Sequence, residues 1–373
     1  MLEFMTQCRR ELHRIPELEL DLPETCAYVK EKLKDLSCRI LEPTQCSVCA
    51  FFDEGKKDTI AFRADMDALP IAEQTGLPFA STHPGRMHAC GHDGHTAMLL
   101  GLSRIVEQRR GTLGHNVLLV FQPAEENTGG AKPLCDSGIF EQLHVKCIFG
   151  FHLWPGRPKG EIYTKAGPLM AKSSETTLHV QGKSVHISRY GEGRDAIWAA
   201  GEFLRRIYRM EEEEIPADVP SLLRFGRMEG GHVRNAVAAE AVLEGTLRAF
   251  TLNRFDWLKQ RCRDIAAEVE RDTGCTMTLS FSEGYPPVTN DAALLERVCR
   301  HLGADAPKNF DGYALATEDF AWYQQKLPGV FFFLGVGDTE ELHSARFTFD
   351  ESVMAKGLAM NEKLLDLDLS GMD

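Results

Sequence analysis

The sequence of 373 residues lacks any long apolar segment and has no surplus of basic residues. No apolar run approaches the roughly 20 residues that a helix needs to cross a bilayer. The first residues, MLEFMTQCRRELHR, interleave charges with apolar side chains, unlike a signal peptide. These features predict a cytoplasmic protein with no membrane partner. The 42 basic residues are outnumbered by 55 acidic ones, giving a net charge of −13, and this predicts no nucleic-acid partner because phosphate binding requires a basic face.

Several catalytic motifs are also absent. The sequence contains no G-x-S-x-G nucleophile elbow, no G-x-x-x-x-G-K-[ST] phosphate loop and no dinucleotide fingerprint after a predicted strand. The 11 cysteines are odd in number and scattered through a long chain, which is not the pattern of a small disulfide scaffold. We therefore expect reduced thiols and a chemistry other than serine hydrolysis, phosphoryl transfer or hydride transfer.

The order of apolar patterns predicts two domains of different architecture. In the N-terminal part, short apolar runs that are typical of buried strands alternate with helical patterns. The same alternation returns after Pro287, where we expect a helix over 317–326. This alternation predicts an α/β domain with a mostly parallel central sheet. The buried strands are expected at 48–52, 59–64, 117–121 and 147–151, with a helix over 96–106.

A different order occupies the middle of the chain. Between about residues 174 and 283 the patterns follow the order β-α-β-β-α-β, which is the split ferredoxin-like unit. We therefore predict an α+β domain over 173–284, inserted into an α/β domain made of residues 1–172 and 285–373. In open parallel sheets, ligands bind at the carboxyl ends of the strands. Three of the predicted strands are followed by side chains that can bind metal, so these side chains should meet at one edge: Asp65 and Asp67 after 59–64, Glu125 and Glu126 after 117–121, and His152 after 147–151.

The densest group of reactive side chains is the segment 88–95, HACGHDGH. Thiolate and imidazole are ligands that zinc prefers, and harder cations add carboxylates. A polar loop with one buried thiol is the simpler interpretation of such a segment. However, three histidines, one cysteine and one aspartate within eight positions favour metal binding, with Cys90 and His92 as ligands.

The remaining candidate ligands come from distant parts of the chain. Two adjacent acids such as Glu125 and Glu126 usually lie in solvent, but at the end of a buried strand they would be costly without cations or donors nearby. From their position alone, either acid could bind metal. His152 and His343 are ambiguous singly. Together the set offers one thiolate, three imidazoles and a carboxylate, which exceeds one tetrahedral site and suggests two metal ions.

These residues lie within sequence blocks that resemble a known family. The chain is similar to the metal-dependent N-acyl amino acid amidohydrolases, which include hippurate hydrolase, auxin-conjugate hydrolases and N-acetyldiaminopimelate deacetylase, within the aminoacylase and carboxypeptidase G group of metallopeptidases. The resemblance runs nearly end to end. The matching blocks include RRELHRIPEL at 9–18, IAFRADMDALPI at 60–71, MHACGHDGHTAMLLG at 87–101, FQPAEE at 121–126, GFHLWP at 150–155, TEDFAWY at 317–323 and LHSARF at 342–347.

The resemblance implies a deacylase that hydrolyses the amide bond of a small N-acyl amino acid. It implies that Glu125 is the general base and that Asp65 orients a ligand imidazole. It also implies two divalent cations (manganese, zinc, cobalt or nickel), bound by Cys90, His92, Glu126, His152 and His343. A dipeptidase or carboxypeptidase of the same group, or a metal-binding or amino-acid-binding protein without activity, are the alternatives. A Cys90 nucleophile would leave the carboxylates and the distant histidines without a role.

The resemblance also assigns roles to the inserted domain. It implies that this domain serves as a lid and as the contact of a homodimer. His186 would stabilise the oxyanion, in its own subunit's site or in the partner's, and Asn235 and Arg248 would hold the carbonyl and the free carboxylate of the substrate. The segment around His186, SVHISRYG, departs from the common G-G-H-A-A-x-P-H pattern of relatives, so the resemblance does not extend to substrate preference.

Overall fold

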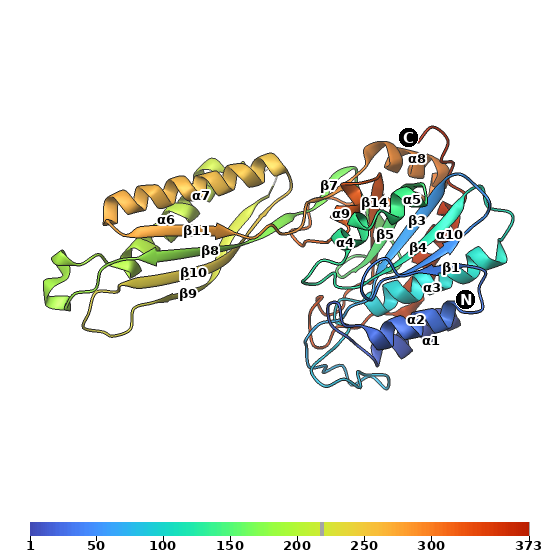
Figure 1. Cartoon of the computed structure of the whole chain (residues 1–373), viewed down its shortest axis with the longest axis horizontal. Helices are drawn as coiled ribbons and strands as arrows, with labels where there is room; N and C mark the ends of the chain where they lie inside the picture. The colour runs from blue at the N-terminus through green and yellow to red at the C-terminus, as the bar shows by residue number, and fades with distance from the viewer. Residues whose placement is uncertain (217–219, 373) are drawn as a thin grey trace. The chain divides into compact units, whose positions relative to one another are not determined.

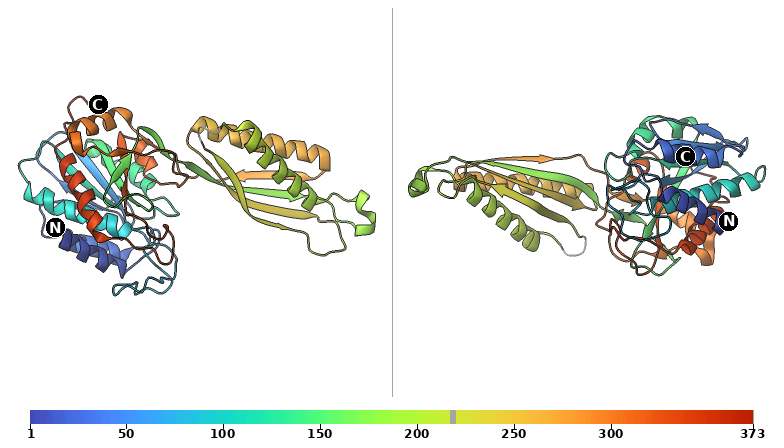
Figure 2. Two further views of the ribbon diagram at one scale, coloured as in Figure 1. Left: turned by 180° about the vertical axis from the view of Figure 1, so that it is seen from behind. Right: turned by 90° about the horizontal axis from the view of Figure 1, so that it is seen from below.

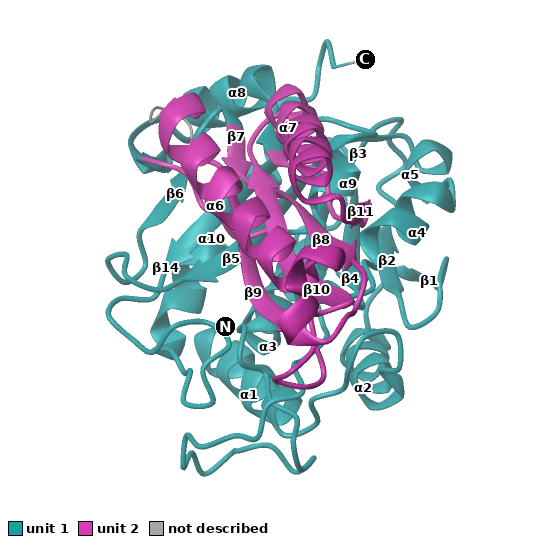
Figure 3. Cartoon of the chain, turned by 90° about the vertical axis from the view of Figure 1, so that its left-hand side faces the viewer, with its two compact units in different colours: residues 1–167, 289–311, 318–373 teal, residues 168–288, 312–317 magenta. Residues whose placement is uncertain are grey.

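The computed structural model describes residues 1–216 and 220–372 (Figure 1, Figure 2) and divides into two compact units (Figure 3). Unit 1 consists of residues 1–167, 289–311 and 318–373, and unit 2 of residues 168–288 and 312–317. The sequence-based limits of the inserted domain were 173 and 284. The segment 312–317 was not part of that prediction. It joins unit 2 because the Ala314 amide donates to Leu169 and the Leu315 carbonyl accepts from Arg248.

Unit 1 is built on a sheet of eight described strands in the order β1-β2-β4-β3-β5-β14-β6-β13. Its centre, β4-β3-β5-β14, is parallel, as the sequence predicts for an α/β domain, while β1, β2 and β6 pair antiparallel to their neighbours. The strands are β1 (Arg39–Leu41), β2 (Val48–Phe52), β3 (Thr59–Asp65), β4 (Asn116–Gln122), β5 (Val145–Trp154), β6 (Ile162–Thr164), β13 (Lys308–Asn309) and β14 (Gly329–Gly335).

Helices cover both faces of this sheet. Alternate side chains of a strand point to opposite faces, so Phe332 belongs to the core shared with α3, whereas Phe331 packs 4.9 Å (ring centroids) from Phe320 on the other side. Helices α1, α2 and α10 pack around α3, and α4 contacts α9. The helices are α1 (Leu2–His13), α2 (Pro23–Leu33), α3 (His92–Gln108), α4 (Ala131–Asp136), α5 (Ile139–Gln142), α8 (Ala292–Leu302), α9 (Ala321–Gln324) and α10 (Met354–Leu364).

Two helices differ from their predicted limits. Helix α3 begins at His92, four residues before the predicted start, with Gly91 in the left-handed region (φ 87°) as its N-cap. The helix predicted over 317–326 is shortened to α9, because Glu318 and Asp319 turn their carboxylates to the buried Arg63. Both differences place additional side chains at the carboxyl edge of the sheet.

Unit 2 has the predicted order of strands and helices. Its antiparallel sheet has the order β11-β8-β10-β9, and the apolar faces of α6 and α7 pack on one side of it. A separate two-stranded sheet pairs β7 (Gly167–Met170) with β12 (Val288–Asn290). The elements of unit 2 are β8 (Lys172–Gln181), α6 (Ala196–Glu214), β9 (Leu222–Gly230), β10 (Glu240–Ala249), α7 (Leu252–Thr273) and β11 (Thr276–Phe281). The lid and dimer roles of this unit stay predictions.

Among the described residues, no helix combines the length and the apolar character that crossing a membrane requires. The cytoplasmic location stays a prediction.

Two helical glycines test how tightly α3 is packed. A Cβ on Gly94 would lie 2.6 Å from the Phe349 ring, whereas a Cβ on Gly201 in α6 would meet nothing within 4 Å. We expect Gly94→Ala to lower the free energy of unfolding by about 2 kcal/mol through overpacking. Gly201→Ala should raise it by up to about 1 kcal/mol, because alanine favours the helix. Urea unfolding of both variants measures the difference, and equal effects would contradict the packing described for α3.

Candidate metal centre

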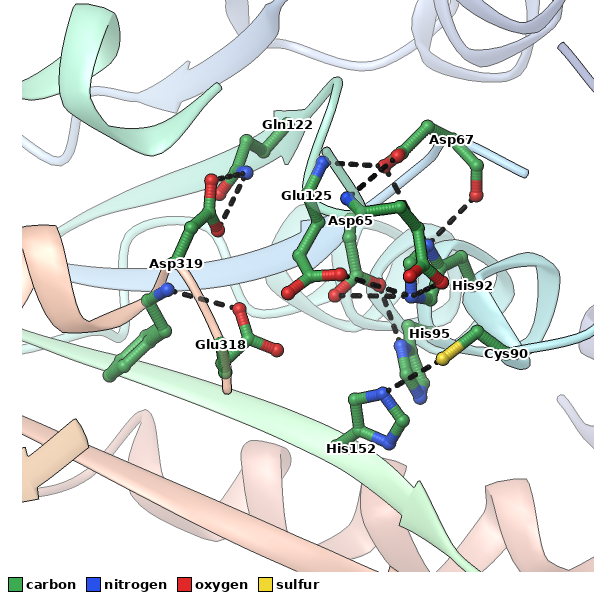
Figure 4. A network of polar contacts seen from close by, with 12 residues as sticks. Asp65, Asp67, Cys90, His92, His95, Gln122, Glu125, His152, Glu318 and Asp319 are labelled. Atoms are coloured by element: carbon green, nitrogen blue, oxygen red, sulfur yellow. Dashed lines mark hydrogen bonds and ion pairs between the residues drawn. The ribbon is translucent and has the colours of Figure 1, made fainter. Parts of the chain in front are cut away.

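The carboxyl edge of the unit 1 sheet collects the predicted site residues. Asp65 ends β3 and is paired in register with Gln122 at the end of β4, and His152 lies near the end of β5. The loop before α3 adds Cys90, and the first turn of α3 adds His92 (Figure 4). Segments far apart in the sequence therefore meet at one edge, as expected for a parallel sheet.

Three of the predicted ligands form the first group. One donor atom each from Cys90, His92 and His152 lie within 4.8 Å of one another, and all three side chains are buried. The Cys90 Sγ is 3.4 Å from the His152 Nε2. The His92 Nδ1 donates to the Asp67 carbonyl (2.8 Å), so the Nε2 faces the group as an acceptor in the neutral ring. That Nε2 is buried and has no hydrogen-bond partner.

The other two predicted ligands complete a second group that again includes Cys90. Donor atoms of Cys90, Glu126 and His343 lie within 4.8 Å of one another. The His343 Nε2 is 3.3 Å from the Glu126 Oε2, and the Glu126 Oε1 is buried without a hydrogen-bond partner. His343 has a positive φ of 66°, which is unusual for a residue with a Cβ. The structure therefore brings all five predicted ligands together within unit 1.

Hydrogen bonds from their backbone amides to Asp67 fix the positions of Glu125 and Glu126. Ala124 has a positive φ of 57°, and the Asp67 carboxylate accepts hydrogen bonds from the amides of Glu125 (2.9 Å) and Glu126 (3.1 Å). The two side chains share the neighbourhood of His92, whose Nε2 is 4.0 Å from the Glu125 Oε2 and 3.8 Å from the Glu126 Oε1. Strained backbone conformations persist where the surrounding contacts determine them, and here Asp67 provides those contacts.

Asp65 accepts a hydrogen bond from a histidine outside the predicted ligand set. Its Oδ1 accepts from the His95 Nδ1 at 2.6 Å, and the His95 Nε2 accepts from the Leu153 amide at 2.9 Å. Both nitrogens of His95 are thus occupied, which leaves it no lone pair for a metal. The sequence-based expectation was that Asp65 orients a ligand imidazole. In the structure, Asp67 makes the orienting contact to His92, and the Asp65 Oδ2 is 3.9 Å from the His92 Nε2.

Burial and mutual charge shift the pKa values of the group. Burial, together with the charges of Glu318 and Glu126, raises the pKa of Glu125 well above its ordinary value. Burial and the Glu126 charge likewise raise the pKa of Cys90. Burial lowers the pKa of His152 to about 3. Burial opposes the charge on His92, but Asp65, Asp67 and Glu126 outweigh it and raise its pKa to about 10. Five carboxylic acids therefore lie close together in a largely buried space, where bound cations would stabilise their negative charges.

One charged network at this edge carries no assigned role in the sequence-based prediction. Arg63, buried in β3, donates to Gln122 (2.8 Å), Asp65 (2.6 Å), Glu318 (2.9 Å) and Asp319 (2.8 Å). One oxygen each of Glu125, Glu318 and Asp319 lie within 4.8 Å of one another. The signal that could have indicated the network is an arginine inside an otherwise apolar strand, since such a charge must be paired.

The three predicted residues of the inserted domain lie in unit 2, and their roles stay predictions. His186 precedes a short 3-10 helix, η1 (Ile187–Glu192). Its side chain is exposed, and its Nδ1 is 2.8 Å from the Ser188 Oγ. It forms an isolated β-bridge with Ala236, and the Asn235 carbonyl accepts from the Ile187 amide, so His186 and Asn235 are neighbours. Arg248 lies on β10, with its Nη1 donating to the Leu315 carbonyl and its Nε buried without a partner.

A second buried network supports the start of α3. The Asp93 carboxylate, next to His92, is 2.8 Å from the His13 Nδ1 and 3.2 Å from the Arg9 Nε of α1. The other nitrogen of His13 is 3.3 Å from Glu73. Burial opposes the charge on His13, but Asp93 and Glu73 outweigh it and raise its pKa from 6.5 to about 9. A cationic His13 therefore joins α1, α3 and the 73 loop.

Comparisons of the sequence and of the structure with known proteins both find metallopeptidase relatives of one family. Residues 61–367 match the profile of the peptidase family M20/M25/M40. The chain is 36% identical over 362 residues to a protein named N-acetyldiaminopimelate deacetylase from Lacticaseibacillus paracasei, covering 94% of both chains. It is 34% identical to the protein of that name from Oceanobacillus iheyensis, covering 96% of this chain and 97% of the relative.

A solved structure is similar over the whole chain. It is the Bacillus subtilis YXEP protein, described as a dinuclear metal binding peptidase from the M20 family, with a TM-score of 0.85 and 32% identity. The similarity covers 98% of this chain and 97% of that one.

The His13 network predicts a pH dependence of stability. A histidine with a raised pKa contributes stability that is fully present below pH 6.5 and is lost as the pH rises through about 9. At pH 6.5, His13→Gln should therefore lower the free energy of unfolding by on the order of 3 kcal/mol. By pH 9.5 most of that difference should have disappeared.

Unfolding curves at both pH values, with the metal content held constant, measure the effect. His301→Gln, which changes an exposed histidine, is the control and should show no such trend. A difference for His13→Gln that does not change with pH would contradict a charged His13.

Proposed function

The chain belongs to the peptidase family M20/M25/M40, and we propose that it hydrolyses the amide bond of N-acyl amino acids by means of two bound divalent cations. A metal-dependent amidohydrolase is consistent with the relatives that carry the name deacetylase. The observation that carries the proposal is the convergence of five donor side chains from four separate segments beside the buried Glu125. Those proposed ligands are Cys90, His92, Glu126, His152 and His343.

The donor atoms fit cations. The His92 Nε2 and the Glu126 Oε1 are both buried and lack hydrogen-bond partners, a costly arrangement unless something binds between them. Mixed thiolate, imidazole and carboxylate sets suit zinc, manganese, cobalt or nickel. Cys90 belongs to both donor groups, so its thiolate would contribute to the binding of both cations.

Bound cations supply Lewis acidity: they acidify water and polarise the carbonyl of the substrate. Glu125 accepts the proton of the attacking water through its carboxylate and later passes that proton to the nitrogen of the breaking C–N bond. The Glu125 backbone amide donates a hydrogen bond to the Asp67 carboxylate, and this contact fixes the position of the Glu125 backbone. Burial suits this role, because it brings the pKa of a carboxylate closer to that of the groups it exchanges protons with.

We propose that three residues of unit 2 bind the substrate. Arg248 has an unpaired buried Nε and a guanidinium suited to bind the substrate's free carboxylate, while Asn235 and His186 would hold the carbonyl and the oxyanion. Unit 2 also exposes the large apolar side chains Ile197 (45%) and Trp198 (57%) on α6. Exposed apolar residues of this size support a homodimer through unit 2. Sedimentation velocity of the native chain and of Trp198→Glu tests it.

The test of the function is a hydrolysis screen. The metal-free protein is reconstituted with manganese, zinc, cobalt or nickel and presented with N-acetyl and N-benzoyl amino acids, N-acetyldiaminopimelate and free dipeptides. Faster hydrolysis of the N-acyl amino acids supports the proposal. Faster hydrolysis of the dipeptides would make the chain a peptidase, and no hydrolysis with any metal would make it a binding protein.

Glu125→Gln should abolish most turnover while leaving the site assembled. Removal of a general base costs about 10²–10⁴-fold in rate, whereas the proposed ligands are untouched. The measurements are kcat and the metal content by elemental analysis. Glu212→Gln, which removes an exposed carboxylate in α6, serves as the control and should match the native chain. Near-normal turnover of Glu125→Gln would remove Glu125 from the mechanism.

Cys90→Ala should lower the metal content more than any other removal of a buried thiol. A ligand is lost from both donor groups, so binding of both cations should weaken. Cys147→Ala removes another buried thiol, which lies in β5 away from the donor groups, and should retain the native metal content. Elemental analysis after dialysis against a weak chelator compares the two variants. Equal metal contents would refute a contribution of Cys90 to metal binding.

A further inference from the structure

Glu318 is a buried acid that pairs with Arg63 and has no role in the mechanism proposed above. It lies between β13 and α9, beside Asp319, and one of its oxygens is within 4.8 Å of an oxygen of Glu125 and of Asp319. The side chain is 1% exposed. A buried carboxylate so close to the proposed general base requires a reason, because each like charge raises the cost of the other.

Asp319 differs from its neighbour, because its hydrogen bonds are complete. Its carboxylate accepts from the Arg63 Nη2 (2.8 Å), from the Gln122 Nε2 (2.9 and 2.8 Å) and from the Ala131 amide (2.9 Å). Both oxygens are used. Asp319 is therefore a structural anchor that ties the end of β4 to the start of α4.

Only one of the two carboxylate oxygens of Glu318 has hydrogen-bond partners. Its Oε1 accepts from the Arg63 Nη2 (2.9 Å) and from the Phe320 amide (3.0 Å). Its Oε2 is buried and has no hydrogen-bond partner. Such an oxygen is costly unless a donor arrives.

The surroundings of the Glu318 Oε2 favour a hydrogen-bond donor on the substrate over a further cation. Arg63 already places a positive charge against both Glu318 and Asp319, and Asp319 has no oxygen left to offer. A hydrogen bond spans 2.7–3.2 Å, so two oxygens up to 4.8 Å apart can both contact one nitrogen atom between them. The nitrogen of a scissile amide has the required N–H.

We propose that Glu318 is a further catalytic residue, whose Oε2 accepts a hydrogen bond from the nitrogen of the scissile amide as this nitrogen becomes the leaving amine. The proposal rests on the function proposed above. Glu125 transfers its proton to the nitrogen lone pair, the C–N bond breaks, and the amine departs with its original N–H directed at Glu318. Glu318 gains and loses no proton in this step. Its acceptor stabilises the positive charge that develops on the nitrogen.

The substitution Glu318→Gln tests this without removing the Arg63 contact. Arg63 and the Phe320 amide both donate at the Oε1 position, so the amide oxygen of glutamine must take that position. Its NH₂ group then replaces Oε2, where it cannot accept a hydrogen bond. The assay compares the best N-acyl amino acid from the screen with the ester in which oxygen replaces its nitrogen. The ester's leaving group has no N–H.

We expect Glu318→Gln to lower kcat on the amide by about 30-fold, the value of a hydrogen bond to a charged group. On the ester it should change kcat by less than about threefold. Glu318→Asp, whose shorter side chain cannot serve both Arg63 and a substrate, should show the same split. Asp319→Asn is the matched control: it weakens an anchor, so it should lower both activities by the same factor.

The outcomes separate the two proposals. A loss for Glu318→Gln that is equal on amide and ester, or no loss on either, would overturn the role of Glu318, while native hydrolysis of the amide still supports the function. Absence of hydrolysis by the native, metal-loaded chain would overturn both. Ester activity and metal content of each variant report that the site is folded.

Discussion

The buried guanidinium of Arg63 is the interaction on which the catalytic edge of unit 1 depends. It lies in the central strand β3 and donates to side chains of β3, of β4 and of the segment before α9. A charge so deeply buried is tolerated only when it is fully paired. The acids that meet it, Asp65, Glu318 and Asp319, have the same requirement. Their hydrogen bonds and ion pairs with Arg63 therefore hold β3, β4 and the segment before α9 together at this edge.

Near Arg63, the backbone is strained at two positions that orient the proposed catalytic and metal-binding side chains. Ala124 and His343 both have positive φ angles, at 57° and 66°, directly beside the acid pair and at a proposed ligand. Neither residue is glycine, so each conformation has a cost. Hydrogen bonds compensate: Asp67 accepts from the amides that follow Ala124, and the His343 amide donates to the Ala89 carbonyl. The donor atoms consequently converge although they come from strand ends, a loop and a helix start.

The sequence allowed the architecture and the donor set to be predicted, but not the contacts that organise them. The parallel centre, the inserted β-α-β-β-α-β unit and the cluster at 88–95 all leave a pattern of apolar spacing or of unusual composition. Helix α3 was expected to begin late, because the glycines at 91 and 94 are poor helix formers. Glu318 and Asp319 were overlooked because they lay inside the helix predicted over 317–326, where two adjacent acids usually face the solvent. The role of Asp67 left no signal, because its partners are backbone amides, which every residue has.

The way in which Asp67 holds two successive amides has a consequence for how this edge of the protein can change over time. The Asp67 carboxylate fixes the backbone of both Glu125, the proposed general base, and Glu126, a proposed metal ligand. A substitution that moves Asp67 would displace Glu125 and Glu126 together. Proton transfer by Glu125 and metal binding by Glu126 therefore cannot change independently through this residue. Divergence of such a protein towards new substrates is therefore easier in unit 2, whose residues do not share this anchor.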